Sequence, residues 1–223
     1  MTDAPVPEQT LWVPSRGGLP KAEQTRRTRA LIVSTGTRCI AEIGYAGTTM
    51  LLISQEAGIS RGPLHYHFAD RNALMAAIAA ALPTATTEAV RKQLAAARTI
   101  EQRLTAMIDI ALGEHLGPHH FVAMELLLAA RNDADLAAAI RPHFQASEAL
   151  SDGWWSEYFA MLRWPRAKLI AFRHVGVACL RGLALDHLLQ GDAEAHAEAL
   201  ALFRAMFLSY ARSAPVPTPK AAD

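Results

Sequence analysis

Apolar residues recur at the three- and four-residue spacing of amphipathic helices through most of this chain. No run alternates apolar and polar residues as a half-buried strand would, and no internal repeat is present. In residues 21–43, Val33, Thr37 and Ile40 share one face, and Gly44 follows as a stop signal. The pattern predicts an all-α fold, with further helices near residues 70–82, 84–97, 100–115, 119–131, 133–162, 166–189 and 192–212.

Glycine and proline mark the ends of these helices. The dipeptides at 117–118, 164–165 and 190–191 each contain glycine, proline or both, and they separate neighbouring helices. Pro142 falls inside the long segment 133–162, and we expect it to kink or divide that segment. Alanine is abundant and β-branched residues are sparse, which also favours helix.

Residues 48–71 predict two short helices that meet at a glycine turn. The first begins at a threonine N-cap and ends at Gly58, which can adopt the left-handed conformation. The second begins at Ser60, and Pro63 falls in its first turn, where the missing N–H costs nothing. This arrangement is typical of a helix-turn-helix, whose second helix enters the major groove of DNA. The cap and apolar stripe of the first helix are Thr48, Thr49, Met50, Ile53 and Ala57.

The second helix carries groups suited to nucleic acid. Arg61 lies near its start, where a guanidinium can pair with a guanine edge, and Arg71 beyond it can contact phosphate. Leu64 and Phe68 are expected to pack a core, which is compatible with contacts by their neighbours. Tyr66 has the alternative of packing in that core, and His65 and His67 have the alternative of being ordinary surface or core histidines. The expected DNA contacts from the motif are Thr49, Ser60, Arg61, Gly62, Pro63, His65, Tyr66, His67 and Arg71.

A string of residues in register resembles the DNA-binding domain of tetracycline-repressor-like (TetR/AcrR) regulators over about residues 22–80. The matching residues are Gly44-Tyr45, Thr48-Thr49, the run Glu56-Ala57-Gly58-Ile59-Ser60-Arg61-Gly62-Pro63-Leu64-His65-Tyr66-His67-Phe68, then Arg71 and Leu74. The chain departs from the family pattern at Leu51-Leu52, Ile53-Ser54, Leu64-His65 and Arg71. The resemblance implies an operator-binding homodimer whose last two long helices form a four-helix interface.

The domains follow from these features. We expect a flexible arm over 1–20, which holds four prolines and includes Trp12, as either a packing or a loop residue. A three-helix helix-turn-helix domain would occupy 21–82, and a larger helical domain for effector binding and dimerisation would occupy 83–213. The proline-rich tail 214–223 is expected to be flexible.

Charge is unevenly distributed along the chain. Residues 16–71 contain eight basic and four acidic residues, a net +4, whereas residues 72–223 contain fourteen and fifteen, a net −1. A positive N-terminal field suits contact with the DNA backbone. Arg26 and Arg27 at the start of the first helix are candidate phosphate ligands, with a solvated helix end as the alternative.

The last two predicted helices indicate self-association. Helix 166–189 is apolar over most of its surface and carries small residues that allow another helix to approach. A helix that is apolar on most sides must be buried on most sides, so a two-fold dimer interface is expected, with a monomeric core pair as the alternative. The expected interface residues are Phe172, Gly176, Cys179, Gly182, Phe203, Met206, Phe207 and Tyr210.

Large aromatic and thioether side chains gather in the middle helices beside a few polar groups. Such a set is typical of a small-molecule cavity, although each residue alone is compatible with an ordinary core. We expect an apolar or cationic aromatic effector in a cavity lined by Phe121, Met124, Glu125, Leu128, His143, Trp155 and Tyr158.

No catalytic arrangement, cofactor motif or metal site is predicted. His115, His119 and His120 gather at a helix break, where a polar loop is the expected role, and the two cysteines are expected to be reduced packing thiols. No run reaches the roughly 18 apolar residues of a membrane span, and a cytoplasmic protein is expected. The predicted function is a repressor released from palindromic double-stranded DNA by a small effector. The alternatives are an all-helical enzyme or a ligand-independent regulator with a protein partner.

Overall fold

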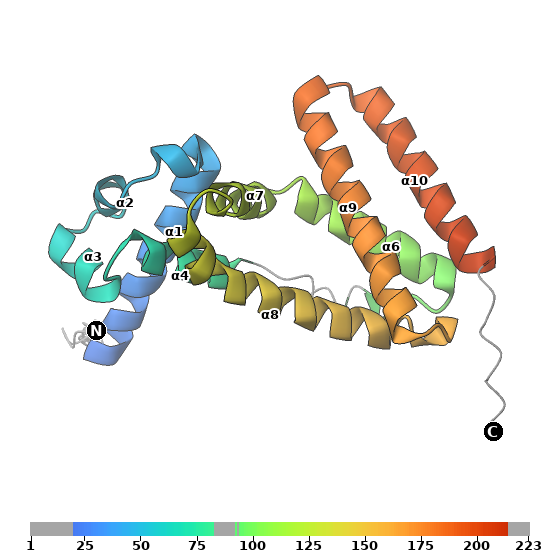
Figure 1. The fold of residues 1–223 in the computed structure, drawn as a ribbon, viewed down its shortest axis with the longest axis horizontal. Helices are drawn as coiled ribbons and strands as arrows, with labels where there is room; N and C mark the ends of the chain where they lie inside the picture. The colour runs from blue at the N-terminus through green and yellow to red at the C-terminus, as the bar shows by residue number, and fades with distance from the viewer. Residues whose placement is uncertain (1–19, 83–91, 93, 214–223) are drawn as a thin grey trace, which may run out of the picture.

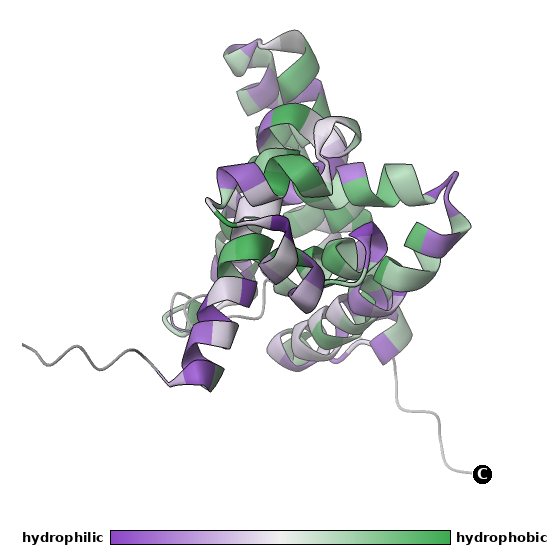
Figure 2. Ribbon diagram, turned by 90° about the vertical axis from the view of Figure 1, so that its left-hand side faces the viewer, coloured by the Kyte–Doolittle hydropathy of each residue, from purple (hydrophilic) through white to green (hydrophobic). Residues whose placement is uncertain are grey.

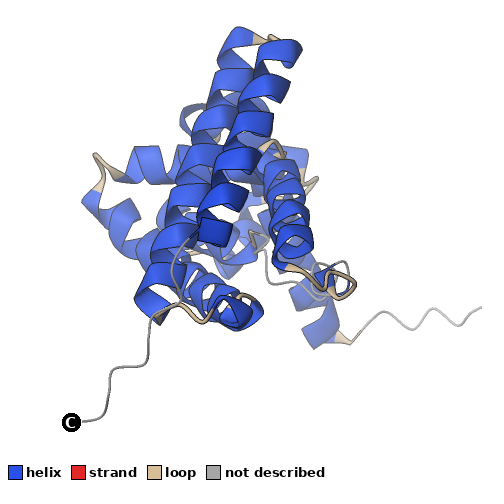
Figure 3. Cartoon of the chain, turned by 90° about the vertical axis from the view of Figure 1, so that its right-hand side faces the viewer, coloured by secondary structure: helices blue, strands red, loops and turns tan. Residues whose placement is uncertain are grey.

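A computed structural model describes residues 20–82, 92 and 94–213. These residues form helices joined by short loops, with no strand among them (Figure 3). Within the described residues, no helix combines the length and apolar composition that crossing a bilayer requires. The helices, labelled in Figure 1, are α1 (Lys21–Gly47), α2 (Met50–Glu56), α3 (Arg61–His67), α4 (Arg71–Ala81), α6 (Ile100–His115), α7 (Pro118–Ala130), α8 (Ala134–Tyr158), a 3-10 turn η1 (Ala160–Leu162), α9 (Arg166–Gln190) and α10 (Ala193–Ser213).

These bounds confirm most of the helix predictions to within a few residues. The predicted first helix continues past Gly44 to Gly47, although Gly44 itself breaks the helical geometry with φ 75° and ψ 167°. Pro142 lies inside α8 as a single helix, so it does not divide that segment. The arm with Trp12, most of helix 84–97 and the tail lie outside the described residues.

Side-chain caps explain where several helices begin. Asp70 Oδ1 accepts from the backbone N of Ala73 at 2.8 Å, and Asp133 Oδ1 accepts from Leu136 at 2.9 Å. Thr99 forms a full capping box with Gln102 at the start of α6. Because the first amides of a helix have no intrahelical partner, each cap locates a helix start from local sequence.

The first apolar core contains side chains from α1, α2, α3 and α4 and from parts of α7 and α8. Ile32, Ile53, Leu64 and Leu74 are almost fully buried in it, and so are Leu126 of α7 and Leu136 and Ile140 of α8. The core around the helix-turn-helix is therefore not confined to residues 21–82. Figure 1 shows α8 leaving this unit and running to the other end of the molecule.

The second core lies among α6, α9, α10 and the C-terminal half of α8. Phe172 of α9 stacks on Phe207 of α10 with ring centroids 4.2 Å apart, and Trp155 of α8 and Phe159 just after it pack beside them. The helices α9 and α10 form an antiparallel pair (Figures 1 and 3).

This packing shows that half of the residues expected at a dimer interface are instead buried within one chain. Phe172, Phe203 and Phe207 are buried within one chain, and a β-carbon on Gly176 would lie 2.8 Å from Phe207 Cζ. The sequence pattern showed that these helices are apolar on several sides but not which side each neighbour covers. The expected residues that stay on the outer surface are Cys179, Gly182, Met206 and Tyr210, whereas the other cysteine, Cys39, is buried as expected.

Arg71 holds the DNA-binding unit together, which corrects its expected role at phosphate. Its Nη2 donates to the carbonyl oxygens of Tyr45 at 2.7 Å and Thr48 at 3.1 Å. The guanidinium carbon also lies 3.9 Å from the centroid of the Tyr45 ring. These contacts connect the start of α4 to the loop that precedes α2, so the side chain is directed inward.

Glu125 is a second tie to the same residue and not a ligand for an effector. Its Oε2 accepts from the backbone N of Tyr45 at 3.0 Å, 80 positions earlier in the chain. The partner exists because Gly44 breaks α1 just before that amide. Residues of α7 and α4 therefore bind the amide and the carbonyl of one residue.

We predict that Arg71→Ala lowers the free energy of unfolding by about 1–3 kcal/mol, because it removes a charged donor from two backbone carbonyls. Chemical denaturation measures this difference. Arg26→Ala is the matched control, since Arg26 is exposed and such changes cost at most about 0.5 kcal/mol. Equal stabilities of the two variants would contradict the assigned role.

We also predict that Gly176→Ala is less stable than Gly153→Ala by about 1–3 kcal/mol, the usual cost of overpacking. Both changes add the same methyl group to a helix, so the gain in helix propensity is matched. A β-carbon at Gly153 would meet nothing within 4 Å, whereas one at Gly176 would collide with the Phe207 ring. Thermal and chemical denaturation at one protein concentration would show no difference if the α9–α10 contact were looser than described.

Candidate nucleic-acid interface and effector cavity

The helix-turn-helix forms as its local sequence predicts. Thr49 caps α2 by accepting from the backbone N of Leu52 at 3.1 Å. Gly58 adopts φ 64°, and the backbone N of Ile59 donates to the carbonyl of Ser54 at 3.0 Å to close the turn. Ser60 then stands at the N-cap of α3 in an extended conformation. Thr48 instead is buried, and its hydroxyl donates to Gly44.

Helix α3 is divided into a buried side and an exposed side. Leu64 and the following Phe68 are buried in the first core, as expected. On the other side Arg61, Gly62, Pro63, His65 and Tyr66 are exposed, and Tyr66 keeps 77% of its surface accessible. Among the described residues, Arg61 makes no ion pair. His67 is half-buried, and its ring packs edge-on against Tyr66 with centroids 5.2 Å apart. The helix thus presents a free guanidinium and an aromatic hydroxyl beside small residues.

The start of α1 adds basic groups at the same end of the molecule. Arg26 and Arg27 are exposed, and both pair with Glu23 one turn earlier. Arg29 lies over the Phe68 ring at 5.2 Å and so connects this end of α1 to the region just after α3. Figure 2, viewed from the helix-turn-helix end, shows the strongly hydrophilic start of α1.

A cavity of about 160 Å³ lies between α6, α8, α9 and α10. Its apolar wall comes mostly from α6 and from the aromatic residues of α8 and α10. The polar groups lie on α6, α8 and α9. The lining includes Leu104, Met107, Ile108, Ala111, Glu114, His115, Ser147, Glu148, Trp154, Trp155, Arg173, Leu180, Arg181, Phe203 and Phe207.

Of the seven expected effector residues, only Trp155 lines this cavity. Helix α7 packs on α1, so Phe121, Met124 and Glu125 do not line the cavity. Leu128 on the same helix is 59% exposed. The Tyr158 hydroxyl donates to the carbonyl of Leu94 and its ring stacks on Trp154, while His143 is half-buried outside the lining. Sequence reasoning missed α6, although Leu104, Met107, Ile108 and Ala111 form an apolar stripe at helical spacing that could have indicated it.

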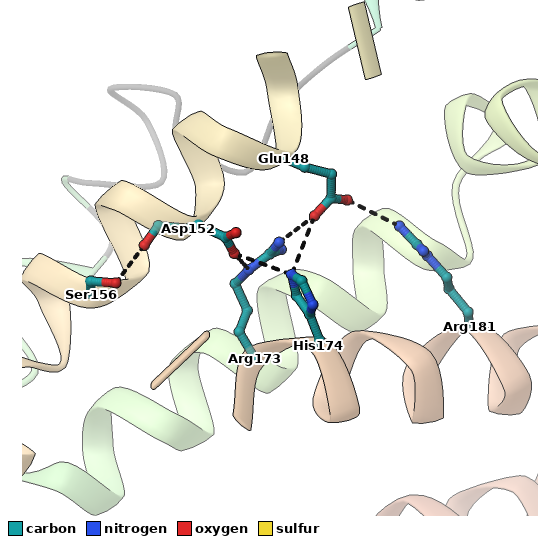
Figure 4. A network of polar contacts seen from close by, with 6 residues as sticks. All are labelled: Glu148, Asp152, Ser156, Arg173, His174 and Arg181. Carbon is teal, nitrogen blue, oxygen red and sulfur yellow. Dashed lines mark hydrogen bonds and ion pairs between the residues drawn. The ribbon is translucent and has the colours of Figure 1, made fainter. Parts of the chain in front are cut away.

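An ion-pair network closes one side of the cavity (Figure 4). Arg173 is buried, and its Nε donates to Asp152 Oδ1 at 2.7 Å while Nη2 donates to Glu148. Arg181 Nη2 lies 3.6 Å from the other oxygen of Glu148, and His174 Nε2 lies 3.3 Å from Asp152 Oδ1. The network fastens α8 to α9, and Arg181 is its loosest member.

The nearby titratable groups are shifted toward their neutral forms. Burial raises the pKa of the Glu114 carboxyl, and burial also lowers the pKa of His115, whose Nδ1–H donates to the carbonyl of Ala111 at 2.6 Å. Burial lowers the pKa of His120 to about 4, with smaller contributions from His115 and Arg181. Burial therefore favours the neutral forms of His115 and His120.

A second hollow of about 280 Å³ adjoins the first. The two share Glu114, His115, Ser147, Glu148 and Arg181 in their linings. The second hollow extends to Ala79 and Leu82 at the end of α4 and to His119 and His120 of α7. Space beside the network thus leads from the second core toward the helix that follows the DNA-binding motif.

Comparisons with known proteins agree with this architecture. The family model described as "Bacterial regulatory proteins, tetR family" matches residues 32–78. The HTH-type transcriptional regulator CymR of Pseudomonas putida is 25% identical over 174 residues, which cover 78% of this chain and 86% of that protein.

Solved structures show the same fold along nearly their whole length. A transcriptional regulator from Rhodococcus sp. Rha1 superposes with a TM-score of 0.63 at 19% identity, over 84% of this chain and 99% of that one. The multidrug binding protein EbrR, complexed with imidazole, gives a TM-score of 0.55 at 21% identity, over 86% and 98%. The proteins matched by sequence are transcriptional regulators, which favours a regulator over the all-helical enzyme. Residues 32–78 thus match the TetR family of bacterial regulatory proteins, and the helix-turn-helix motif and the fold of the described residues agree with that match.

Proposed function

We propose that this regulator is a homodimeric repressor that binds a palindromic operator in the cytoplasm and leaves it when a small molecule enters the cavity between α6, α8, α9 and α10. The single observation that carries the DNA-binding half is the free side of α3. Its other side is buried in the core, so the helix is held rigidly while Arg61 remains available.

The proposed DNA contacts follow from exposure and chemistry. Arg61 would read a base edge, because a bidentate arginine matches guanine in the major groove. Arg26 and Arg27 would contact phosphate beside the groove. The remaining contacts proposed from the motif are Thr49, Ser60, Gly62, Pro63, His65, Tyr66 and His67, all exposed except the half-buried His67.

The outer surface of α9 and α10 supports the dimer. Leu189 is 73% exposed and Met206 is 63% exposed, and Val175, Leu185, Leu188 and Leu202 are exposed on the same two helices. A β-carbon on Gly182 would meet nothing within 4 Å in one chain, which leaves room for a partner helix. Exposed apolar surface of this extent marks an interaction site, and a two-fold axis would bury the same surface on both copies. Two recognition helices set about 34–36 Å apart would then meet successive major grooves.

The cavity supports a small, mostly apolar effector with one polar group. Trp154, Trp155, Phe203 and Phe207 supply aromatic surface, and Glu114 and Arg181 are the acid and the base of the lining with the fewest partners. EbrR, which shares the fold, is a multidrug binding protein, which favours a ligand site in a domain of this kind.

Coupling to DNA would pass through α4 and α7. The second hollow reaches the end of α4, whose start is tied to Tyr45 by Arg71, and α7 is tied to the same residue by Glu125. A ligand that prefers a state in which these helices are displaced would shift the population of dimers away from operator spacing.

The DNA-binding proposal predicts that selection from random duplexes returns a palindrome, bound by the full-length protein with affinity that falls steeply with salt. Arg61→Ala should lower discrimination at one base pair of each half-site by about 1–3 kcal/mol. Arg98→Ala is the control, because it removes the same charge from an exposed site ahead of α6. A selection without an enriched palindrome would refute the proposal. An unchanged preferred sequence in Arg61→Ala would refute only the role of Arg61.

The effector proposal predicts that Ala111→Phe, which fills the cavity, abolishes the response to a ligand and preserves operator affinity. Candidate ligands come from a thermal-shift screen of apolar and cationic aromatic compounds. A true effector should change tryptophan fluorescence and release operator DNA in the wild type and in Ala138→Phe, a control on the exposed side of α8. A compound that alters the fluorescence but leaves operator affinity unchanged would show a cavity without coupling.

A further inference from the structure

Two histidines face each other where α9 and α10 meet their connecting turn. The rings of His187 and His196 have centroids 4.5 Å apart and are tilted by 42°. The backbone fixes both residues beside the turn, since Gly191 N donates to the carbonyl of His187 and His196 N donates to the carbonyl of Asp192, each at 3.1 Å.

Each ring has one nitrogen that is shielded from solvent and lacks a partner. Within the described residues, His187 Nδ1 and His196 Nε2 accept or donate no hydrogen bond. Leaving a buried polar atom unpaired costs about 1–3 kcal/mol, and native proteins rarely contain such atoms without a reason. Two of them on adjacent rings indicate a missing common partner.

The space beside the rings has the charge of a cation site. A small cavity of about 70 Å³ is lined by Leu183, Asp186, His187, Asp192, Ala195, His196 and Ala199, and this lining contains two acids and no basic residue. Asp192 Oδ1 is held in place by the backbone N atoms of Glu194 and Ala195, each at 3.0 Å. Asp186 makes no ion pair or side-chain hydrogen bond with the described residues, so it is free to rotate toward the rings.

We propose that His187 and His196 bind a divalent transition-metal ion, with Asp186 and Asp192 balancing its charge. Neutral imidazole nitrogens are preferred ligands of Zn²⁺, Ni²⁺ and Cu²⁺, and one such ion would satisfy both unpaired nitrogens. The two carboxylates, both exposed to solvent, would neutralise its double charge. The sequence did not indicate this site, because the histidines belong to different helices on either side of Gly191.

The other candidate groups are already occupied. Glu148, Asp152 and His174 place donor atoms within 4.8 Å of one another, but Arg173 binds both carboxylates (Figure 4). The ring of His115 lies 4.7 Å from that of His120, but its Nδ1 is bonded to a carbonyl and Arg181 lies nearby. Only the pair between α9 and α10 combines unpaired nitrogens with unneutralised acids in the described residues.

A bound ion would fasten α9 to α10 at their turn. Leu188 and Leu189, next to His187, belong to the exposed apolar surface of these helices. The ion would hold that surface in one arrangement, although the binding site itself lies within a single chain and does not depend on DNA binding or dimerisation.

The test is titration of chelator-treated full-length protein with ZnCl₂ and NiCl₂ by calorimetry at neutral pH. One ion per chain should bind, and His187→Gln and His196→Gln should each weaken that binding at least about tenfold. His174→Gln is the matched control and should bind as the wild type does. Cu²⁺ bound to the wild type should show electron paramagnetic resonance couplings to two imidazole nitrogens, and to one in either single variant.

A third variant keeps the test valid if the histidine variants do not fold. Asp186→Asn alters an exposed side chain and should weaken the binding of Zn²⁺ without changing the circular dichroism of the protein. The proposal is overturned if the wild type binds none of the three ions, if both histidine variants retain wild-type affinity, or if His174→Gln is the variant that loses binding.

Discussion

The structure depends on α8 taking part in both apolar cores. Leu136 and Ile140 at its start are buried against the DNA-binding unit, and Trp155 at its end is buried against α9, with Phe159 just beyond it. At 1.5 Å per residue, a helix of 25 residues is about 37 Å long, so one rigid element crosses the distance between the two cores. This helix therefore links the two cores directly.

Tyr45 is bound through its backbone to both α4 and α7. Its carbonyl accepts from Arg71 of α4 and its amide donates to Glu125 of α7, and the break at Gly44 makes both groups available. The loop before α2 is thus held from two sides. Any relative movement of α4 and α7 would have to break or carry along one of these bonds, which would shift the start of the DNA-binding motif.

The polar side of the cavity contains both a tightly paired charge and charges with few partners. Arg173 is buried between two carboxylates and stays paired, because an uncompensated buried charge would be strongly destabilising. Arg181 and Glu114 line both hollows; Arg181 has one longer ion pair, at 3.6 Å to Glu148, and the Glu114 carboxyl has none with the described residues. A polar group of a ligand would therefore contact Arg181 or Glu114, while the ion pairs of Arg173 remain intact.

Local sequence by itself determined the helices, their ends and the recognition motif. Thr49, Gly58, Ser60 and Asp70 act through bonds and dihedral angles within a few residues, so the α2–α3 turn and the start of α4 could be predicted without tertiary contacts. The buried role of Leu64 and Phe68 also followed from helical spacing.

Only the tertiary structure decided which side of each apolar helix is covered and which polar groups meet. Phe172 and Phe207 face each other within one chain, Arg71 turns inward, and Glu125 reaches Tyr45 instead of a ligand. The cavity lies along α6, and His187 meets His196 across a turn. Periodicity states that a face is apolar and composition states that a charge exists, but neither contains the distances between helices, and those distances select the partner of each side chain.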